Sequence, residues 1–273
     1  MSTSWIIASG KGGVGKSTLC AGLGEAMAWE GRRVCIIDAD IGLRDQDVLL
    51  GLQNRVMYDL LDVLGGVCTL EQALLSPGGN SRLSLLPASQ FARVKELEPK
   101  AFRKMLAKLK EMFDVVLIDC PAGIERGVRG LMNAEVDRSI IICTPDDICI
   151  RNAERMASVM EKKALPRPQL IVNRLQPELI RSGEMYTAAT VSATLDLPLL
   201  GEIPEDVSIC RAMLKGVSIM DVDCEARRAL IRICWRMLES GVDAPLPHYG
   251  TEKQPWYRRL LHKKTKPLTQ PPA

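Results

Sequence analysis

Short apolar runs alternate along this chain with longer segments of helical periodicity. The apolar runs are bounded by turn residues and cover residues 5–9, 34–38, 83–87, 115–119, 139–144, 170–173 and 199–204. The segments of helical periodicity lie between most of them, at residues 17–29, 99–112, 148–162 and 221–239. Strands that are apolar throughout and alternate with helices are typical of a parallel sheet covered on both faces. The pattern predicts one doubly wound, mostly parallel α/β domain over residues 1–240.

The pattern changes after that domain. Residues 241–255 hold two glycines and three prolines and predict a linker, and the proline-containing end at 265–273 predicts a disordered tail. Between them, residues 256–264 predict a short amphipathic helix. Its apolar face is formed by Trp256, Tyr257, Leu260 and Leu261. Its basic positions are Arg258, Arg259, Lys263 and Lys264. Such a helix can lie on an anionic membrane surface. The alternatives are a helix packed on the domain and a disordered basic tail.

Composition narrows the function classes. The 273 residues carry a net charge of only +3, which argues against coating nucleic acid by charge alone. Nine cysteines without Cys-x-x-Cys spacing, most of them in apolar runs, are typical of reduced, buried thiols in a cytosolic protein. No signal peptide is expected, and no apolar run reaches the length of about 18 residues that a membrane span needs. We therefore expect any membrane contact to be peripheral.

The first strand run leads directly into a phosphate-binding loop. Its residues are Gly10, Lys11, Gly12, Gly13, Val14, Gly15, Lys16, Ser17 and Thr18. A glycine-rich turn that opens a helix lets backbone N–H groups approach phosphate oxygens, where the helix N-terminus favours negative charge. Lys16 is then expected at the β- and γ-phosphates, Ser17 on Mg²⁺ and Thr18 at the α-phosphate. Lys11 adds a second cation that can stabilise the transferring phosphoryl group, or else is a solvated surface lysine.

Two further strand runs end in carboxylates. Asp38 and Asp40 end one of them, and Asp119 ends another in the Walker B pattern. Because ligands of parallel sheets lie beyond the carboxyl ends of the strands, we expect these groups beside the nucleotide. Asp119 would hold Mg²⁺, and Asp40 would orient the attacking water near the ion. The alternative for Asp38 and Asp40 is capping of a turn.

The ends of two later strand runs are candidates for contact with the base. Asn173 has a donor and an acceptor that suit a purine edge, and Arg174 follows it. The segment Pro204, Glu205 and Asp206 follows the last apolar run, where its backbone can flank the base. The residues alone leave open whether Asn173 and Asp206 instead cap the helices that follow.

The loop 11–17, with its second lysine, resembles the deviant Walker A motif of the MinD/ParA family of ATPases. The segments 38–44, 58–59, 86–90, 119–125 and 203–206 are similar to the MinD members of that family. The resemblance covers about residues 4–240 and continues into the C-terminal segment. It implies a P-loop ATPase that uses ATP and Mg²⁺ to place the bacterial division site. Asp45 and Asn152 depart from the family pattern, at positions that the family uses for its interface and its partners.

The resemblance also implies an assembly. Family members form face-to-face dimers around two ATP molecules, and Lys11 matches the lysine that reaches the partner's phosphates. Lys16, Ser17, Asp40 and Asp119 match phosphate, Mg²⁺ and switch positions, and Asn173 matches the adenine-reading position. ATP-bound dimers of the family bind the cytoplasmic face of the inner membrane and recruit the inhibitor MinC. MinE then stimulates hydrolysis and release. The segment 148–162 is expected to meet both partners.

Three other classes of ATPase are alternatives. A ParA-like segregation ATPase would bind DNA through basic surface residues, whereas the charge balance here leads us to expect no nucleic acid. A flagellar-number relative of MinD would also have a membrane tail. An electron-transfer ATPase like the nitrogenase iron protein would need two suitably placed cysteines per chain, and Cys120 has no partner at such a spacing.

Overall fold

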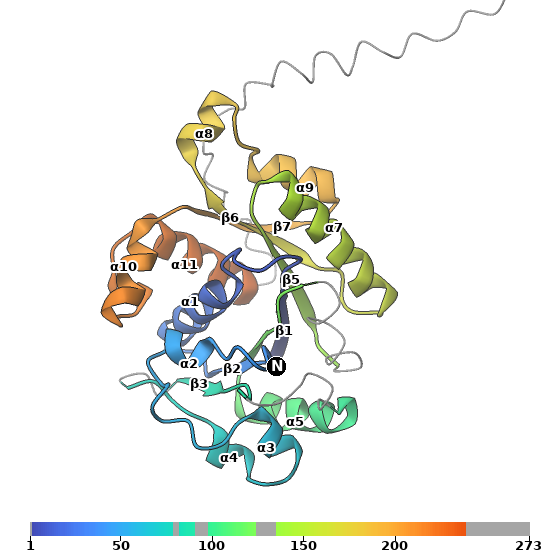
Figure 1. Cartoon of the computed structure of the whole chain (residues 1–273), viewed down its shortest axis with the longest axis vertical. Coiled ribbons are helices and arrows are strands. Elements are labelled where there is room, and N and C mark those ends of the chain that lie inside the picture. Colours follow the sequence, from blue (N-terminus) through green and yellow to red (C-terminus); the bar gives the residue numbers. More distant parts are fainter. Residues whose placement is uncertain (1, 79–81, 91–97, 124–134, 239–273) are drawn as a thin grey trace, which may run out of the picture.

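The computed structural model describes residues 2–78, 82–90, 98–123 and 135–238 (Figure 1). The expected linker at 241–255, the amphipathic helix at 256–264 and the tail at 265–273 lie outside the described residues. Along the described part of the chain, no helix is both long and apolar enough to cross a bilayer.

A seven-stranded sheet forms the centre of the domain, and each strand pairs in parallel with its neighbours. The spatial order is β3-β2-β4-β1-β5-β6-β7. The strands are β1 (Thr3–Ala8), β2 (Val34–Asp38), β3 (Leu83–Leu86), β4 (Val115–Asp119), β5 (Arg138–Cys143), β6 (Gln169–Leu175) and β7 (Leu199–Pro204). Their interiors are buried almost throughout, because helices cover both faces. The predicted doubly wound parallel sheet is confirmed.

Helices pack on the two faces of this sheet (Figure 1). In the first layer lie α1 (Lys16–Trp29) and α11 (Glu225–Leu238), and in the second lie α5 (Pro99–Met112), α7 (Asp147–Lys162) and α9 (Ala188–Leu195). Shorter helical segments join these elements. They are α2 (Gln46–Leu49), α3 (Leu60–Leu64), α4 (Leu70–Ala73), α8 (Pro177–Ser182), α10 (Val207–Lys215) and the 3-10 turn η2 (Ile219–Asp221).

The last helix begins later than its periodicity predicts. The predicted segment at residues 221–239 starts with the end of η2, which the Ser218 hydroxyl caps by accepting a hydrogen bond from the Met220 N–H. The helix α11 itself begins at Glu225. Beside its start, Asp206 accepts a hydrogen bond from the Ala226 N–H at 3.1 Å. Ser218 thus caps the short turn η2 and Asp206 caps the start of α11, so the predicted single helix is two separate elements.

The strand order changes direction at the centre of the sheet. From β1 the chain runs to β2 and β3 on one side, returns to β4 and then crosses to β5 on the other side of β1. The carboxyl ends of β1, β2 and β4 consequently meet at one edge. In open parallel sheets, such a point of reversal is where ligands bind.

The helix α1 carries a carboxyl group whose ionisation is unfavourable in the fold. Burial raises the pKa of Glu25 to about 7, although a hydrogen bond from Ser218 opposes this, and the charge of Asp221 adds to it. A raised pKa in the folded state means that stability falls as pH rises from the ordinary value through 7. We expect Glu25→Gln to stabilise the protein by about 1–3 kcal/mol at pH 8 and by almost nothing at pH 4.5.

Urea unfolding at the two pH values measures this difference, because the amide oxygen of the substituted side chain can accept the same hydrogen bond from Ser218. Replacing the exposed Glu111 by Gln is the matched control and should change stability little at either pH. A gain for Glu25→Gln that is equal at pH 4.5 and pH 8 would show that ionisation is not its cause.

Candidate nucleotide-binding site

The loop between β1 and α1 has the backbone of an anion-binding turn. Gly13 and Gly15 adopt the left-handed φ values of +80° and +93°, which residues with a Cβ rarely take. Gly15 is the N-cap of α1, and no side chain there accepts a hydrogen bond from the first turn. The free N–H groups of that turn and the helix dipole therefore point toward a shared position where a phosphate can bind.

Two asparagines pack closely against this loop. The Asn173 side chain, at the end of β6, is buried and donates a hydrogen bond to the Val14 carbonyl at 2.8 Å. A Cβ on Gly15 would lie 2.5 Å from the Asn173 Nδ2 atom, and a Cβ on Gly10 would lie 2.4 Å from the Asn152 carbonyl oxygen of α7. Glycine is thus needed at both positions for close approach. The predicted base-reading residue Asn173 supports the phosphate loop in this structure.

The two central charged groups of the site form a buried ion pair. The Lys16 Nζ atom lies 2.5 Å from an Asp119 carboxylate oxygen, and the two side chains are 5% and 1% exposed. Lys16 also donates to the Ser17 hydroxyl at 3.2 Å. Burial opposes the charged form of Lys16, but the charge and hydrogen bond of Asp119 outweigh it, so the pKa of Lys16 is raised. Lys16 is therefore held charged beside the predicted Mg²⁺ ligands Ser17 and Asp119.

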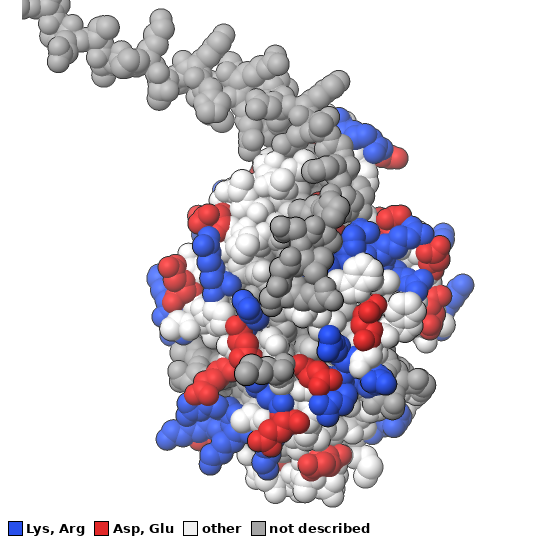
Figure 2. Space-filling view, turned by 180° about the vertical axis from the view of Figure 1, so that it is seen from behind, with Lys and Arg blue, Asp and Glu red and all other residues white. Residues whose placement is uncertain are grey.

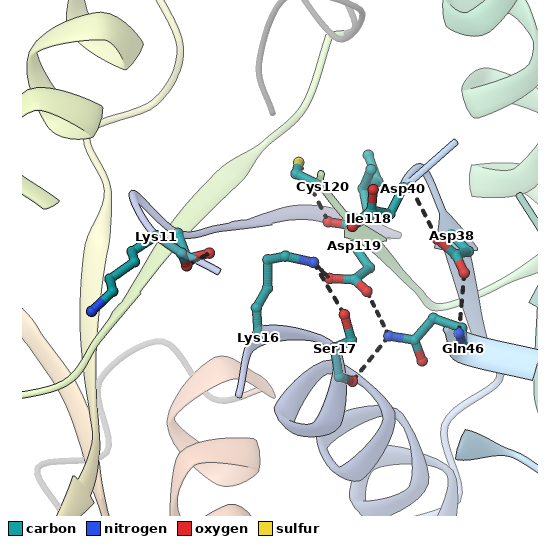
Figure 3. A network of polar contacts seen from close by, with 10 residues as sticks. Lys11, Lys16, Ser17, Asp38, Asp40, Gln46, Ile118, Asp119 and Cys120 are labelled. Carbon is teal, nitrogen blue, oxygen red and sulfur yellow. Dashed lines mark hydrogen bonds and ion pairs between the residues drawn. The ribbon is translucent and has the colours of Figure 1, made fainter. Parts of the chain in front are cut away.

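Gln46 is a part of the site that no sequence motif indicated. It is the first residue of α2 and is fully buried. Its side-chain amide donates to Asp119 at 2.7 Å and to the Ser17 carbonyl at 2.9 Å, and its backbone N–H donates to Asp38 at 3.1 Å. Figure 3 shows Lys16, Ser17, Gln46 and Asp119 directed toward one another at the edge of the sheet.

The acids after β2 line the same edge. Asp38 and Asp119 are paired residues at the ends of neighbouring strands, and burial together with the charge of Asp119 raises the pKa of Asp38 to about 7. Asp38 accepts hydrogen bonds from the Asp40 and Gln46 backbones. Burial also raises the pKa of Asp40, and the charge of Asp45 adds to this effect. Asp38 therefore has the turn-capping contacts, whereas Asp40 is nearly buried within the charged cluster.

Lys11 lies apart from this cluster. It is exposed, and Figure 3 shows its side chain pointing away from Lys16 and Asp119. The Ser9 hydroxyl donates to the Lys11 carbonyl at 3.0 Å, which holds the backbone of the loop there. Within one chain, the Lys11 ammonium is thus directed outward from the edge of the loop.

The predicted base-contact segments lie at the ends of β6 and β7. Arg174 has a left-handed backbone, and its guanidinium lies 3.8 Å from the exposed Glu205 carboxylate. Asp206 caps two helices, since it accepts from the Ser208 N–H of α10 and from the Ala226 N–H of α11. The Asp206 side chain is therefore engaged in capping, and Pro204 ends β7 as a buried residue. If this segment contacts a base, its backbone groups would make the contact.

The residues present fit a magnesium–nucleotide complex. The uncapped first turn of α1 and the buried Lys16 match the charge of a polyphosphate, and Ser17 and Asp119 supply the oxygen ligands that Mg²⁺ prefers. The ion would neutralise charge that develops on the transferring phosphoryl group. Lys16 would stabilise the same oxygens from the protein side, and the closed packing of Asn173 and Asn152 would keep the loop in place.

The fold and this site define a P-loop ATPase. The sequence model of the "CobQ/CobB/MinD/ParA nucleotide binding domain" matches residues 5–219. The chain belongs to this family, and septum site-determining MinD proteins are among its relatives. It is 38% identical to the MinD of Bacillus subtilis over 245 residues, which are 89% of this chain and 91% of the relative.

Solved structures agree with this assignment. The MinC:MinD cell division protein complex of Aquifex aeolicus matches with a TM-score of 0.82 and 35% identity, over 92% of this chain and 100% of that one. The MinD of Pyrococcus horikoshii complexed with Mg-ADP matches with a TM-score of 0.77 and 28% identity, over 90% and 100%. The predicted family, the ATPase activity and the use of ATP with Mg²⁺ are confirmed.

Proposed function

We propose that this ATPase places the cell-division septum by switching between a free state and a membrane-bound dimer. ATP brings two chains together, the dimer recruits a MinC-like inhibitor, and a MinE-like partner stimulates hydrolysis and release. The likeness to the MinD of the MinC:MinD complex, over nearly the whole of both chains, is the observation that carries this proposal. The protein then works in the bacterial cytoplasm and on the cytoplasmic face of the inner membrane.

The contact between α7 and the phosphate loop supports coupling of partner binding to hydrolysis. A Cβ on Gly10 would lie within 2.8 Å of the Asn152 carbonyl and Cβ, so α7 packs directly against the loop. The same helix exposes Arg151, Glu154 and Arg155 to solvent. A partner bound to this exposed face would act on the phosphate loop through Asn152. This contact uses backbone and Cβ atoms of Asn152, which an acid at the same position would also have, and the outer face of α7 is exposed.

The charge distribution supports a membrane rather than DNA as the surface on which the dimer assembles. On the face seen in Figure 2, basic and acidic side chains are interspersed over the domain and form no broad basic area. The concentrated basic and apolar positions are those of residues 256–264, outside the described residues. Two copies of so short a segment bind more tightly than one, because the second binds at a high effective concentration. Dimerisation on ATP would thereby control membrane binding.

Sedimentation with anionic liposomes tests this proposal. The full chain should pellet with liposomes in ATP and remain mostly in the supernatant in ADP. A chain that ends before Trp256 should stay in the supernatant in both nucleotides, while its ATP affinity is unchanged. The fraction pelleted should fall as salt is raised, since basic residues supply part of the attraction.

The same assay separates the alternatives. Equal pelleting in ATP and ADP, or pelleting that persists without residues 256–264, would remove the membrane switch from the proposal. Retention on DNA in ATP by the shortened chain would favour a ParA-like segregation role instead. A uniformly neutral liposome is the control, because it offers the apolar surface without the negative charge.

A further inference from the structure

Gln46 lies between the two buried carboxylates at the centre of the site. Asp38 and Asp119 end neighbouring strands in register, and both are fully buried. Gln46 binds Asp38 through its backbone N–H and Asp119 through its side chain, at 3.1 and 2.7 Å. One residue at the start of α2 therefore binds both carboxylates, at the ends of β2 and β4.

The orientation of the Gln46 amide follows from its neighbours. The Nε2 atom lies 2.9 Å from the Ser17 carbonyl and 2.7 Å from an Asp119 carboxylate oxygen. Both neighbours are acceptors, so only the NH₂ group can face them, and a flipped amide would bring three acceptors together. The carbonyl oxygen of Gln46 is thereby directed to the other side.

That carbonyl oxygen has an unused hydrogen-bonding capacity. It is buried and has no hydrogen-bond partner within the part of the chain that the structure describes. A buried acceptor without a donor is unfavourable, and buried polar groups in native proteins almost always have a protein or water partner. The oxygen belongs to a side chain that already contacts Asp119 and the backbone of Ser17, the two residues whose oxygens fit Mg²⁺. Bound Mg²⁺ usually keeps several waters, and such a water is a strong donor.

Gln46 shares the binding of the Asp119 carboxylate with Lys16. Lys16 donates a hydrogen bond to one oxygen of the Asp119 carboxylate, and the Gln46 amide donates to the other. When a polyphosphate shares the Lys16 ammonium, the ion pair to Asp119 weakens. Gln46 then remains as the neutral donor that keeps this carboxylate in place.

We propose that Gln46 is a positioning residue for the magnesium–nucleotide complex. Its amide N–H group holds the Asp119 carboxylate, and its carbonyl accepts a hydrogen bond from a water of the ion. Because its backbone binds Asp38, the ion's arrival is transmitted to the loop that carries Asp40. Gln46 thus stabilises bound Mg²⁺ specifically and contributes little to the binding of the nucleotide without the ion.

Equilibrium binding of a fluorescent ADP analogue, with excess Mg²⁺ or with EDTA, tests this role without using hydrolysis. The variants are Gln46→Met, which keeps the length and removes both polar groups, and Gln46→Asn, whose amide is one methylene too short. We expect both to bind the analogue in EDTA within about twofold of the original chain. In Mg²⁺ we expect both to bind about tenfold more weakly, and the Mg²⁺ concentration for half-maximal effect should rise similarly.

The exposed Gln53→Met is the matched control and should match the original chain in both conditions. Thermal unfolding without nucleotide shows whether each variant folds. An equal loss of affinity in Mg²⁺ and EDTA would mean that Gln46 only supports the fold, and this would overturn the proposal. Unchanged affinity of Gln46→Met in Mg²⁺ would overturn it as well. Original behaviour of Gln46→Asn would contradict the reach argued from the two short hydrogen bonds.

Discussion

Replacing Lys16 by Met should abolish ATP hydrolysis and also weaken the protein without nucleotide. The first effect is expected to be on the order of 100- to 1000-fold in turnover, because Lys16 is a buried cation that we expect to contact the phosphates. The second arises because the Asp119 carboxylate is left buried without its ion pair, which costs about 3–5 kcal/mol. Urea unfolding and single-turnover hydrolysis measure the two effects separately.

A double-mutant cycle shows whether these effects have different causes. Adding Asp119→Asn to Lys16→Met removes the unpaired charge, so much of the lost stability should return while hydrolysis stays absent. The exposed pair Arg33 and Asp114 provides the control cycle, with side chains 56% and 38% exposed. Its coupling should be about 0–1 kcal/mol. A coupling for Lys16 and Asp119 that is no larger than this control would contradict a buried, mutually dependent pair.

Local patterns were sufficient to predict the framework of this fold. The runs at residues 34–38, 115–119 and 199–204 match β2, β4 and β7 to the residue, because strands buried on both faces are apolar from end to end. The phosphate loop could also be predicted from the sequence, because the residues that define it, the glycines and Lys16, are close together along the chain. The carboxylates that end β2 and β4 could also be placed, because parallel strands bring their ends to one edge.

Features that depend on tertiary contacts could not be predicted in this way. Gln46 stands in a polar stretch where burial has no periodic signal, and only the folded chain brings its amide to Ser17 and Asp119. The support of the loop by Asn173 likewise depends on a contact between distant segments. Capping boxes at Asp59 and Thr69 were readable signals for α3 and α4, but helices of five and four residues are too short for periodicity to show.

The two departures from the family pattern near the loop differ in what they contact. Burial is the main cause of the raised pKa of Asp40, and the charge of Asp45 in the same loop adds to it. The Asn152 atoms that pack against Gly10 are backbone and Cβ atoms, which an acid at this position would also have. Lys11 differs from both, because its side chain is exposed and directed outward. A role for Lys11 therefore requires a group that comes from outside the chain.

Replacing Lys11 by Ala should leave the single chain intact and abolish the ATP-dependent dimer. Because the side chain is exposed, we expect stability to change by less than about 0.5 kcal/mol and ATP affinity of the monomer by less than about twofold. If Lys11 contacts the partner's phosphates, turnover should fall by about 100-fold or more, as when a cation supplied in trans is removed. Sedimentation velocity with ATP measures the dimer, and the exposed Lys100→Ala is the control.

Mixing two defective chains distinguishes action in trans from action in cis. A chain with Asp40→Ala keeps Lys11 but lacks the carboxylate expected to orient water, whereas the Lys11→Ala chain has the opposite defect. In a mixed dimer, Lys11 of the first chain would face the nucleotide held by the second, which retains Asp40. Hydrolysis should therefore recover to a fraction of the original rate, in proportion to the mixed dimers formed. If Lys11 acts within its own chain, each site still lacks one group and mixing restores nothing.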